Sequence, residues 1–210
     1  MNYNHNQSNP RLRIQRFAVL QSVLFAAYVG LVTFAGCDYG PSSSRPDDPW
    51  IFHSLENAVR HADIAEDLRI FNSGSEVLPD SLLMLPKLRN LEWSSGRLRI
   101  IPPFIAELNS LKALAVSFCP LDTLPAEIGQ MKILSGLSVE WCELRALPDE
   151  ICDLSTLVHL WVRNNHISRL PDGIHKLTHL RSLNIAGNPI DSTEIERIRR
   201  ALPNLETFKY

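Results

Sequence analysis

The 210-residue sequence is poor in the residues on which several classes of small protein depend. Its four cysteines are too few for a disulfide-stapled mini-protein, and they lack the close pairing of a zinc site. Twenty-one basic and twenty-three acidic side chains nearly cancel, and no run of one sign is long enough to follow a phosphate backbone or an anionic membrane surface. Nucleic acid is therefore not expected as a partner.

The sequence also lacks the short motifs that carry catalytic chemistry. It has no glycine-rich phosphate loop and no His-Glu-x-x-His stretch. His175 and His179 are four residues apart, which would suit two ligands of one metal on a helix, but no third ligand accompanies them. We predict that both are solvated, and that Asp149, Glu150 and Asp153 form a solvated polar edge. The expected protein is not an enzyme and needs neither a metal nor another cofactor.

One long uncharged stretch stands at the N-terminus, from Phe17 to Phe34, and it follows Arg11, Arg13 and Arg16. A basic segment before an apolar one is the layout of an export signal. Eighteen helical residues span about 27 Å, which is also enough for an uncleaved membrane anchor. Residues 1–36 are therefore predicted to be a signal peptide or an anchor. Either one places the rest of the chain on the extracytoplasmic side, because the arginines stay in the cytoplasm.

This stretch ends in Phe34-Ala35-Gly36-Cys37, which resembles the lipobox of bacterial lipoproteins. It departs from that motif at Phe34, where leucine is favoured. The resemblance implies that Cys37 is acylated and becomes the mature N-terminus, so that a lipid holds the protein in the cell envelope. Residues 37–49 then form a flexible tether, because the segment after Tyr39 is rich in proline and serine and has no apolar residue to bury.

An internal repeat dominates the remaining sequence. An apolar residue followed by proline recurs every 23 residues, at Leu78, Ile101, Leu124, Leu147 and Leu170. Ten and eight positions before each of these anchors stand apolar residues, and four and seven positions after it stand others. Apolar residues two apart indicate a strand, whereas apolar residues three apart after the proline indicate a short helical or 3-10 turn. One such unit cannot bury its apolar side alone, so neighbouring units must stack.

The pattern resembles the leucine-rich-repeat family in its 23-residue form. The resemblance implies an α/β fold, a short curved solenoid with a parallel sheet on its concave face and short helical or 3-10 segments on its convex face. About five and a half repeats are expected over residues 65–190. Helical caps are expected at residues 50–64, after Asp48-Pro49, and at residues 191–210, where Asp191 and Glu194 have capping-box spacing.

The family places asparagine five positions before each anchor, and only Asn165 and Asn188 follow that rule here. Cysteine is an accepted substitute, so Cys119 and Cys142 are predicted to be buried structural thiols. They occupy equivalent places on adjacent strands, so a disulfide between them is the alternative in an oxidising compartment. Cys152, on the return segment, is expected to be simply packed.

Members of the family usually bind partners with the exposed positions of the concave sheet. There the sequence gathers large aromatic side chains beside opposite charges, which is the composition of interface anchors. The expected site consists of Phe118, Trp141, Trp161 and Arg163, with Glu140 orienting the arginine and with Arg69 and Glu92 at the rim. The alternatives are that Phe118 and Trp141 only cover the core, or that this surface joins two copies of the chain.

The function predicted from the sequence is a non-catalytic protein–protein interaction module, tethered outside the cytoplasm of a bacterium. Two other interpretations stay open. The same aromatic side chains suit a surface adhesion or carbohydrate-binding protein, and without a working leader the chain would be a cytoplasmic interaction module.

Overall fold

The structure is a computed structural model that describes residues 51–210 of the chain. The predicted signal peptide or anchor at 1–36, the tether at 37–49 and the lipidation site Cys37 lie outside the described residues. In residues 51–210, no helix has both the length and the apolar character needed to cross a membrane.

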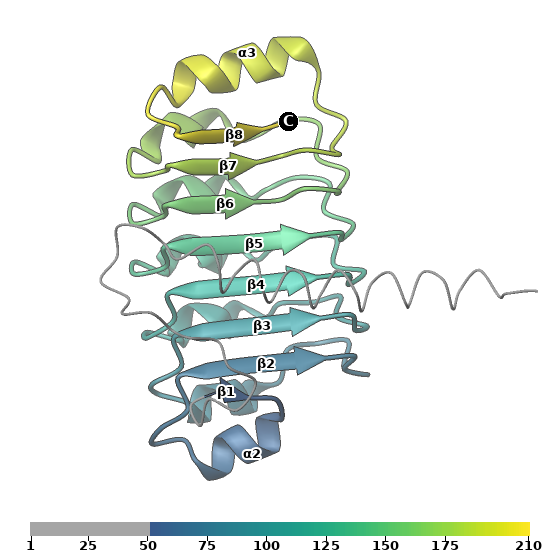
Figure 1. The fold of residues 1–210 in the computed structure, drawn as a ribbon, viewed down its shortest axis with the longest axis vertical. Coiled ribbons are helices and arrows are strands. Elements are labelled where there is room, and N and C mark those ends of the chain that lie inside the picture. Colours follow the sequence, from purple (N-terminus) through teal and green to yellow (C-terminus); the bar gives the residue numbers. More distant parts are fainter. Residues whose placement is uncertain (1–50) are drawn as a thin grey trace, which may run out of the picture. The chain divides into compact units, whose positions relative to one another are not determined.

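Eight parallel strands form one sheet in which the spatial order equals the chain order (Figure 1). They are β1 (Ile51–Phe52), β2 (Asp67–Phe71), β3 (Asn90–Ser94), β4 (Ala113–Ser117), β5 (Gly136–Glu140), β6 (His159–Trp161), β7 (Ser182–Asn184) and β8 (Thr207–Lys209). Leu114 pairs with Leu91 on one side and with Leu137 on the other. From β2 to β7 the pairing therefore steps by the 23 residues of the sequence repeat.

Each strand from β2 to β6 is followed by a return segment that contains a short 3-10 helix. The five 3-10 helices are η1 (Asp80–Met84), η2 (Pro103–Glu107), η3 (Ala126–Gln130), η4 (Asp149–Asp153) and η5 (Asp172–Lys176). Each begins directly after the proline of the repeat, whose ring fixes φ and whose missing N–H would have no partner in a first turn. The helix then directs one leucine or isoleucine per repeat into the core, for example Ile128 in η3.

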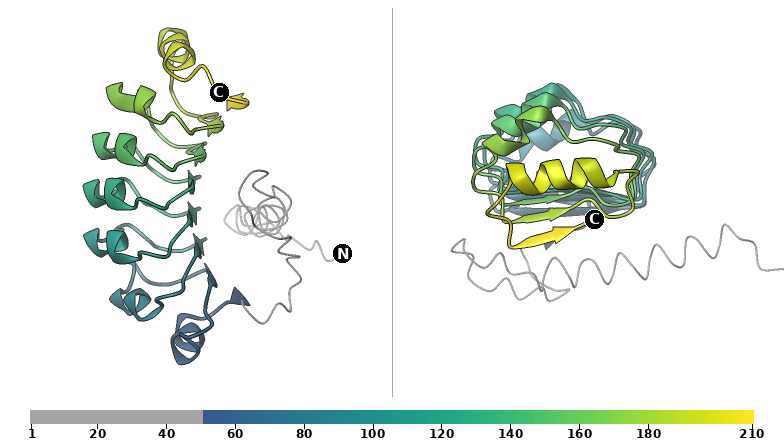
Figure 2. Two further views of the ribbon diagram at one scale, coloured as in Figure 1. Left: turned by 90° about the vertical axis from the view of Figure 1, so that its left-hand side faces the viewer. Right: turned by 90° about the horizontal axis from the view of Figure 1, so that it is seen from above.

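The core lies between the sheet and the row of 3-10 helices. Leu114, Leu137 and Leu160 are almost completely buried there, as are Val116 and Val139 two residues further along their strands. Figure 2 shows the strands on the concave side of the stack and the 3-10 helices on the convex side. This confirms the predicted leucine-rich-repeat solenoid.

The N-terminal end differs in detail from the expected helix. Ile51 and Phe52 form β1, which pairs with β2, and the helix α2 is limited to Leu55–Arg60. The side chain of Ser54, and not the earlier Asp48-Pro49, caps α2 by accepting a hydrogen bond from the N–H of Asn57. The extra strand β1 provides hydrogen-bond partners for the backbone of β2 that would otherwise form an open sheet edge. Helix α2 covers the end of the core with the buried Ala58.

At the other end, helix α3 (Ser192–Ala201) begins at Asp191, whose carboxylate accepts from the N–H of Glu194. Glu194 does not complete a capping box. Its carboxylate accepts instead from the backbone N–H of Leu170, and Arg197 donates to the carbonyl of that residue. The two side chains thus replace the backbone groups that a further repeat would supply. After α3, β8 extends the sheet by one strand.

Candidate functional site

The aromatic pair Phe118–Trp141 lies just beyond the ends of β4 and β5. The two rings stack with centroids 5.7 Å apart and an angle of 13° between their planes. Phe118 is half-buried, whereas Trp141 exposes 39% of its surface. Trp141 is therefore not buried in the core, although Phe118, on which it stacks, is half-buried.

Both aromatic residues have left-handed backbone, with φ of 54° at Phe118 and 55° at Trp141. Every residue at the equivalent position of the repeat shares this conformation, and the others are Asn72, Ser95, Asn164 and Gly187. Glycine and asparagine tolerate positive φ, but a bulky aromatic residue is an outlier there. The backbone therefore gives no reason for Phe and Trp at these two positions.

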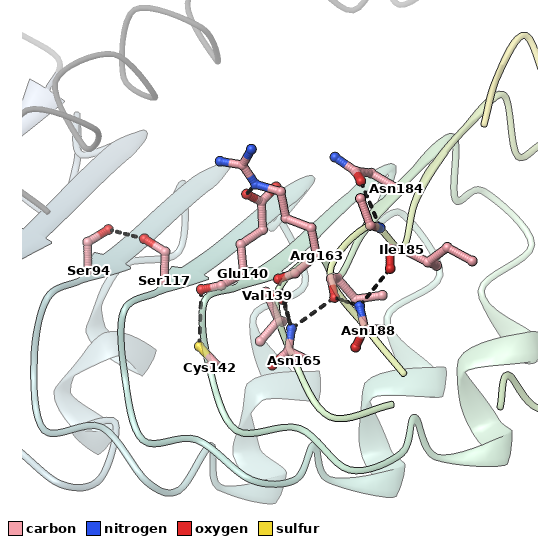
Figure 3. Close-up of polar contacts among 12 residues, drawn as sticks. Ser94, Ser117, Val139, Glu140, Cys142, Arg163, Asn165, Asn184, Ile185 and Asn188 are labelled. Atoms are coloured by element: carbon pink, nitrogen blue, oxygen red, sulfur yellow. Dashed lines mark hydrogen bonds and ion pairs between the residues drawn. The ribbon is translucent and has the colours of Figure 1, made fainter. Parts of the chain in front are cut away.

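Arg163 links the aromatic pair to a buried acid. Its Nε donates to Oε2 of Glu140 at 2.5 Å (Figure 3), and its guanidinium carbon lies 5.9 Å from the centre of the Trp141 ring. Burial raises the pKa of Glu140, and the charge and hydrogen bond of Arg163 act against that rise. This is the contact through which Glu140 was predicted to orient Arg163. Its expected exposure is wrong, because only 3% of Glu140 is exposed and the arginine replaces water as its partner.

Trp161 belongs to a second aromatic group on the concave face, formed with residues of its own strand and of β7. Its indole N–H donates to the hydroxyl of Ser182 at 2.9 Å, and its ring meets His159 edge-on at 5.8 Å. Burial lowers the pKa of His159 to about 4, so this imidazole is neutral at pH 7. The register pairs Trp161 with Ser138 of β5, which is the strand that leads into Trp141. The predicted patch is therefore two neighbouring groups, each with its own contacts.

Arg69 and Glu92 form a third, polar group at the N-terminal part of the sheet. The Nε of Arg69 lies 3.4 Å from the Asp67 carboxylate and 4.0 Å from that of Glu92. Burial raises the pKa of Glu92, while Arg69 and a hydrogen bond from Ser94 act to lower it. Glu92 was expected at an exposed rim but is buried, because its carboxylate is turned toward these partners on β2 and β3.

The turn after each strand is held by the asparagine or cysteine of the repeat. The amide of Asn165 donates to the carbonyl of Val139 (Figure 3) and to that of Val162, and it accepts from the N–H of Leu144. Asn188 makes the equivalent bonds one repeat later. Cys119 and Cys142 donate only to the carbonyl two residues earlier in the chain.

The three cysteines in residues 51–210 are buried, as predicted, and they are free in this structure. Burial raises the pKa of Cys119, that of Cys142 to about 12 and that of Cys152 to about 11. These thiols are therefore protonated at neutral pH and unsuited to nucleophilic chemistry. His175 and His179 are exposed on the convex side, and within residues 51–210 no cluster of three His, Cys, Asp or Glu could hold a metal ion.

Sequence reasoning found the main side chains but missed two features of the site. The left-handed column had a signal, since Asn72, Asn164 and Gly187 are residues that favour positive φ. The contacts that join Trp161 to His159 and Ser182 had none, because side-chain direction across a sheet does not follow from spacing alone.

The geometry defines a class of protein: a parallel-sheet solenoid whose concave face carries aromatic and charged side chains. Residues 104–209 match the family model described as a leucine-rich repeat region, and the chain belongs to the leucine-rich-repeat family. No curated protein matches the sequence.

Solved structures agree with this assignment. A leucine-rich-repeat protein of Leptospira interrogans is 30% identical, with a TM-score of 0.54, over 70% of this chain and 44% of that one. An internalin of Listeria monocytogenes is 20% identical, with a TM-score of 0.54, over 71% and 43% of the two chains. A plant peptide hormone receptor in complex with RGF2 is 21% identical, with a TM-score of 0.52, over 76% and 30%. The chain thus spans less than half the length of each of these relatives, and the last two show the fold alone.

Proposed function

We propose that this protein is a non-catalytic module that binds a protein partner through its concave face, with the Phe118–Trp141 pair as the anchor. Membership of the leucine-rich-repeat family supports a binding role of this kind. The buried, protonated thiols of residues 51–210 offer no activated nucleophile in support of an enzyme.

The observation that carries the proposal is the placement of two large aromatic residues on left-handed backbone at the edge of a concave sheet. Positive φ at a bulky residue costs about 1–2 kcal/mol relative to glycine. Such strain is typical of functional sites, where the surrounding structure holds a side chain in place for an external partner. Trp141 remains exposed beside an arginine, which is the composition of a binding hot spot.

The test is a pull-down of the full chain from its own membranes, run in parallel with Trp141→Ala, Trp161→Ala and the control Ile133→Ala. Ile133 is an exposed apolar residue outside both aromatic groups. A protein that co-purifies with the wild type and with the control, but not with the tryptophan variants, is the expected result. Each tryptophan variant should weaken binding by about 2 kcal/mol or more. The proposal fails if partners are retained by both variants, or if only changes at His175 and Lys176 on the convex side release them.

A carbohydrate-binding adhesin is the second candidate, because the nearly parallel rings of Phe118 and Trp141 present a flat face on which a sugar ring could stack. Sugar binding would be lost in Trp141→Ala but would be insensitive to salt. Binding of an oligosaccharide array by the wild type, with no protein recovered in the pull-down, would replace the first proposal with this one.

We further propose that the leader and Cys37 tether the module on the extracytoplasmic side of a bacterial membrane. The support is the order of basic segment, apolar segment and Phe34-Ala35-Gly36-Cys37 in the sequence. Mass spectrometry of the N-terminal peptide should find an acylated Cys37 at the mature N-terminus. An intact N-terminus with unmodified Cys37 in the membrane fraction would indicate an uncleaved anchor, and recovery of that form from the cytosol would indicate an interaction module of the cytoplasm.

A further inference from the structure

Arg163 has hydrogen-bonding capacity that its own structure does not use. A guanidinium carries five N–H donors, and here only the one on Nε is engaged, with Glu140. Among residues 51–210, the two terminal nitrogens have no acceptor within hydrogen-bond distance. Figure 3 shows both of them directed away from the Glu140 carboxylate and off the sheet. A planar fork of donors is thus presented outward from the concave face.

The fork is also held in a fixed position. Glu140 lies in β5 and binds Nε from one side, while the Trp141 ring lies 5.9 Å from the guanidinium carbon. An arginine free in solvent loses side-chain entropy when it binds a ligand, whereas Arg163 is already ordered by these two contacts. The planar fork matches the two oxygens of a carboxylate in a bidentate arrangement.

The charge around the fork favours an anion. Lys209 of β8 is exposed and lies close enough to Glu140 that its charge lowers the pKa of that acid, as the charge of Arg163 does. The pairing of β7 with β8 sets Lys209 beside Asn184, in the row that continues from Ser138 through Trp161. Arg163, in contact with Glu140, and Lys209, further along the sheet, therefore both act as positive charges on the single carboxylate of Glu140, which favours an anion at this part of the concave face.

We propose that the partner binds here through a peptide segment in which an aspartate or glutamate stands next to an aromatic or aliphatic residue. The acidic side chain takes the terminal nitrogens of Arg163, and its apolar neighbour packs on the Phe118–Trp141 pair. This inference rests on the proposed function and specifies the chemistry of the partner at the same surface.

The experiment selects a displayed library of random 12-residue peptides on the full-length chain in detergent solution. We expect enrichment of peptides that carry an acid next to an apolar residue. A selected peptide is then remade with the acid changed to its amide. That change should weaken binding to the wild type at least fivefold, and it should have less than a twofold effect on binding to Arg163→Gln.

Two further variants of the chain keep the test decisive if Arg163→Gln, which leaves Glu140 unpaired, folds poorly. Arg163→Lys keeps the positive charge but removes the fork, and it should lose most of the preference for the acid over the amide. Lys209→Gln changes an exposed residue, and it should weaken acidic peptides without changing the melting temperature. The matched control is Lys87→Gln, an exposed lysine on the segment between η1 and β3, which should bind the peptides as the wild type does.

The outcomes separate the two proposals. If selected peptides depend on Trp141 but tolerate the acid-to-amide change, or are enriched in lysine and arginine, the acidic-segment inference is wrong and the proposed function stands. If no selected peptide distinguishes the wild type from Trp141→Ala, the binding surface itself is misplaced, and both proposals fall.

Discussion

One position of the repeat, shortly after the end of the strand, has the same left-handed backbone in six successive repeats, whatever its side chain. Asn72, Asn164 and Gly187 are suited to that conformation. Phe118 and Trp141 are not, so the requirement of the turn and the choice of side chain conflict at these two positions. Conflicts of this kind are expected where a surface is selected for binding as well as for folding.

The conflict predicts an inverted order of stability at Trp141. Trp141→Gly should be more stable than Trp141→Ala by about 1 kcal/mol, because only glycine relieves the strain of positive φ. The same pair of substitutions at Ser117, within β4, should show the normal order, with alanine the more stable. Urea denaturation of the four variants measures both differences. Equal stabilities of the glycine and alanine variants at Trp141 would show that the backbone there is unstrained.

At the scale of elements, the convex side depends on how closely one 3-10 helix approaches the next. Gly129 lies in η3, and a Cβ built at that position would be only 2.3 Å from the carbonyl oxygen of Glu150 in η4. Backbone atoms cannot move aside as a flexible side chain can. The spacing of η3 and η4 therefore requires a residue without a side chain at this point.

Gly129→Ala should accordingly destabilise the fold by about 1–3 kcal/mol through forced separation of η3 and η4. Gly74→Ala is the matched control, because no atom lies within 4 Å of a Cβ at that position. The control should be neutral or slightly stabilising. Thermal melts compare the two variants, and identical melting temperatures would show that the convex row can widen without cost.

The C-terminal cap depends on one charged pair, Glu194 and Arg197, which closes the last repeat at Leu170. Burial is the largest influence on the pKa of Glu194 and acts to raise it. The hydrogen bonds from Arg197 and from the Leu170 N–H, with the arginine's charge, outweigh burial and leave the pKa below its ordinary value. A lowered pKa means that the folded state binds the proton less readily than the unfolded state does.

The cap therefore contributes stability above the ordinary pKa of a glutamate, and this contribution is lost as the pH falls through the lowered pKa of the folded state. Glu194→Gln should reduce stability at pH 7 by about 1–2 kcal/mol, since hydrogen bonds to a charged acceptor become neutral ones. The variant should also lose part of the acid dependence, so that its unfolding free energy approaches that of the wild type at low pH. Chemical denaturation at pH 7 and at pH 3 checks this, and a constant difference at both values would contradict the charged cap.

At the scale of the whole molecule, residues 51–210 are a one-dimensional stack whose stability arises between neighbouring repeats. Leu137 lies in β5 near the middle of that stack, paired with Leu114 and Leu160 on the adjacent strands. Loss of its side chain weakens the repeat that connects the two halves of the array.

Leu137→Ala should cost about 2–5 kcal/mol and should lower the melting temperature of the entire array in one transition. Circular dichroism gives the melt, and hydrogen exchange shows whether β2 and β7 lose protection together. The control is Ile133→Ala, an exposed apolar residue close by in the sequence. A variant that melts within a degree or two of the wild type would contradict the burial of Leu137, and separate transitions for the two halves would contradict cooperative stacking.

The sequence by itself determined the solenoid, its register and the placement of its prolines, because the same pattern of apolar residues and proline recurs every 23 residues and favours the same strand and turn in each unit. It also predicted that Cys119 and Cys142, at the repeat position of Asn165 and Asn188, are buried, and that Glu140 orients Arg163. It did not predict that β1 precedes the N-terminal helix, since a two-residue strand has no periodic signal.

Only the tertiary structure decided how the concave side chains are grouped. It paired Phe118 with Trp141, turned Trp161 toward Ser182 and buried Glu140 and Glu92 against arginines. These contacts join residues of neighbouring repeats, and their directions depend on rotamers and backbone angles that a repeat pattern leaves open. A column in the sequence fixes which side chains are neighbours, whereas packing in three dimensions fixes which of those neighbours touch and which donors are left facing outward.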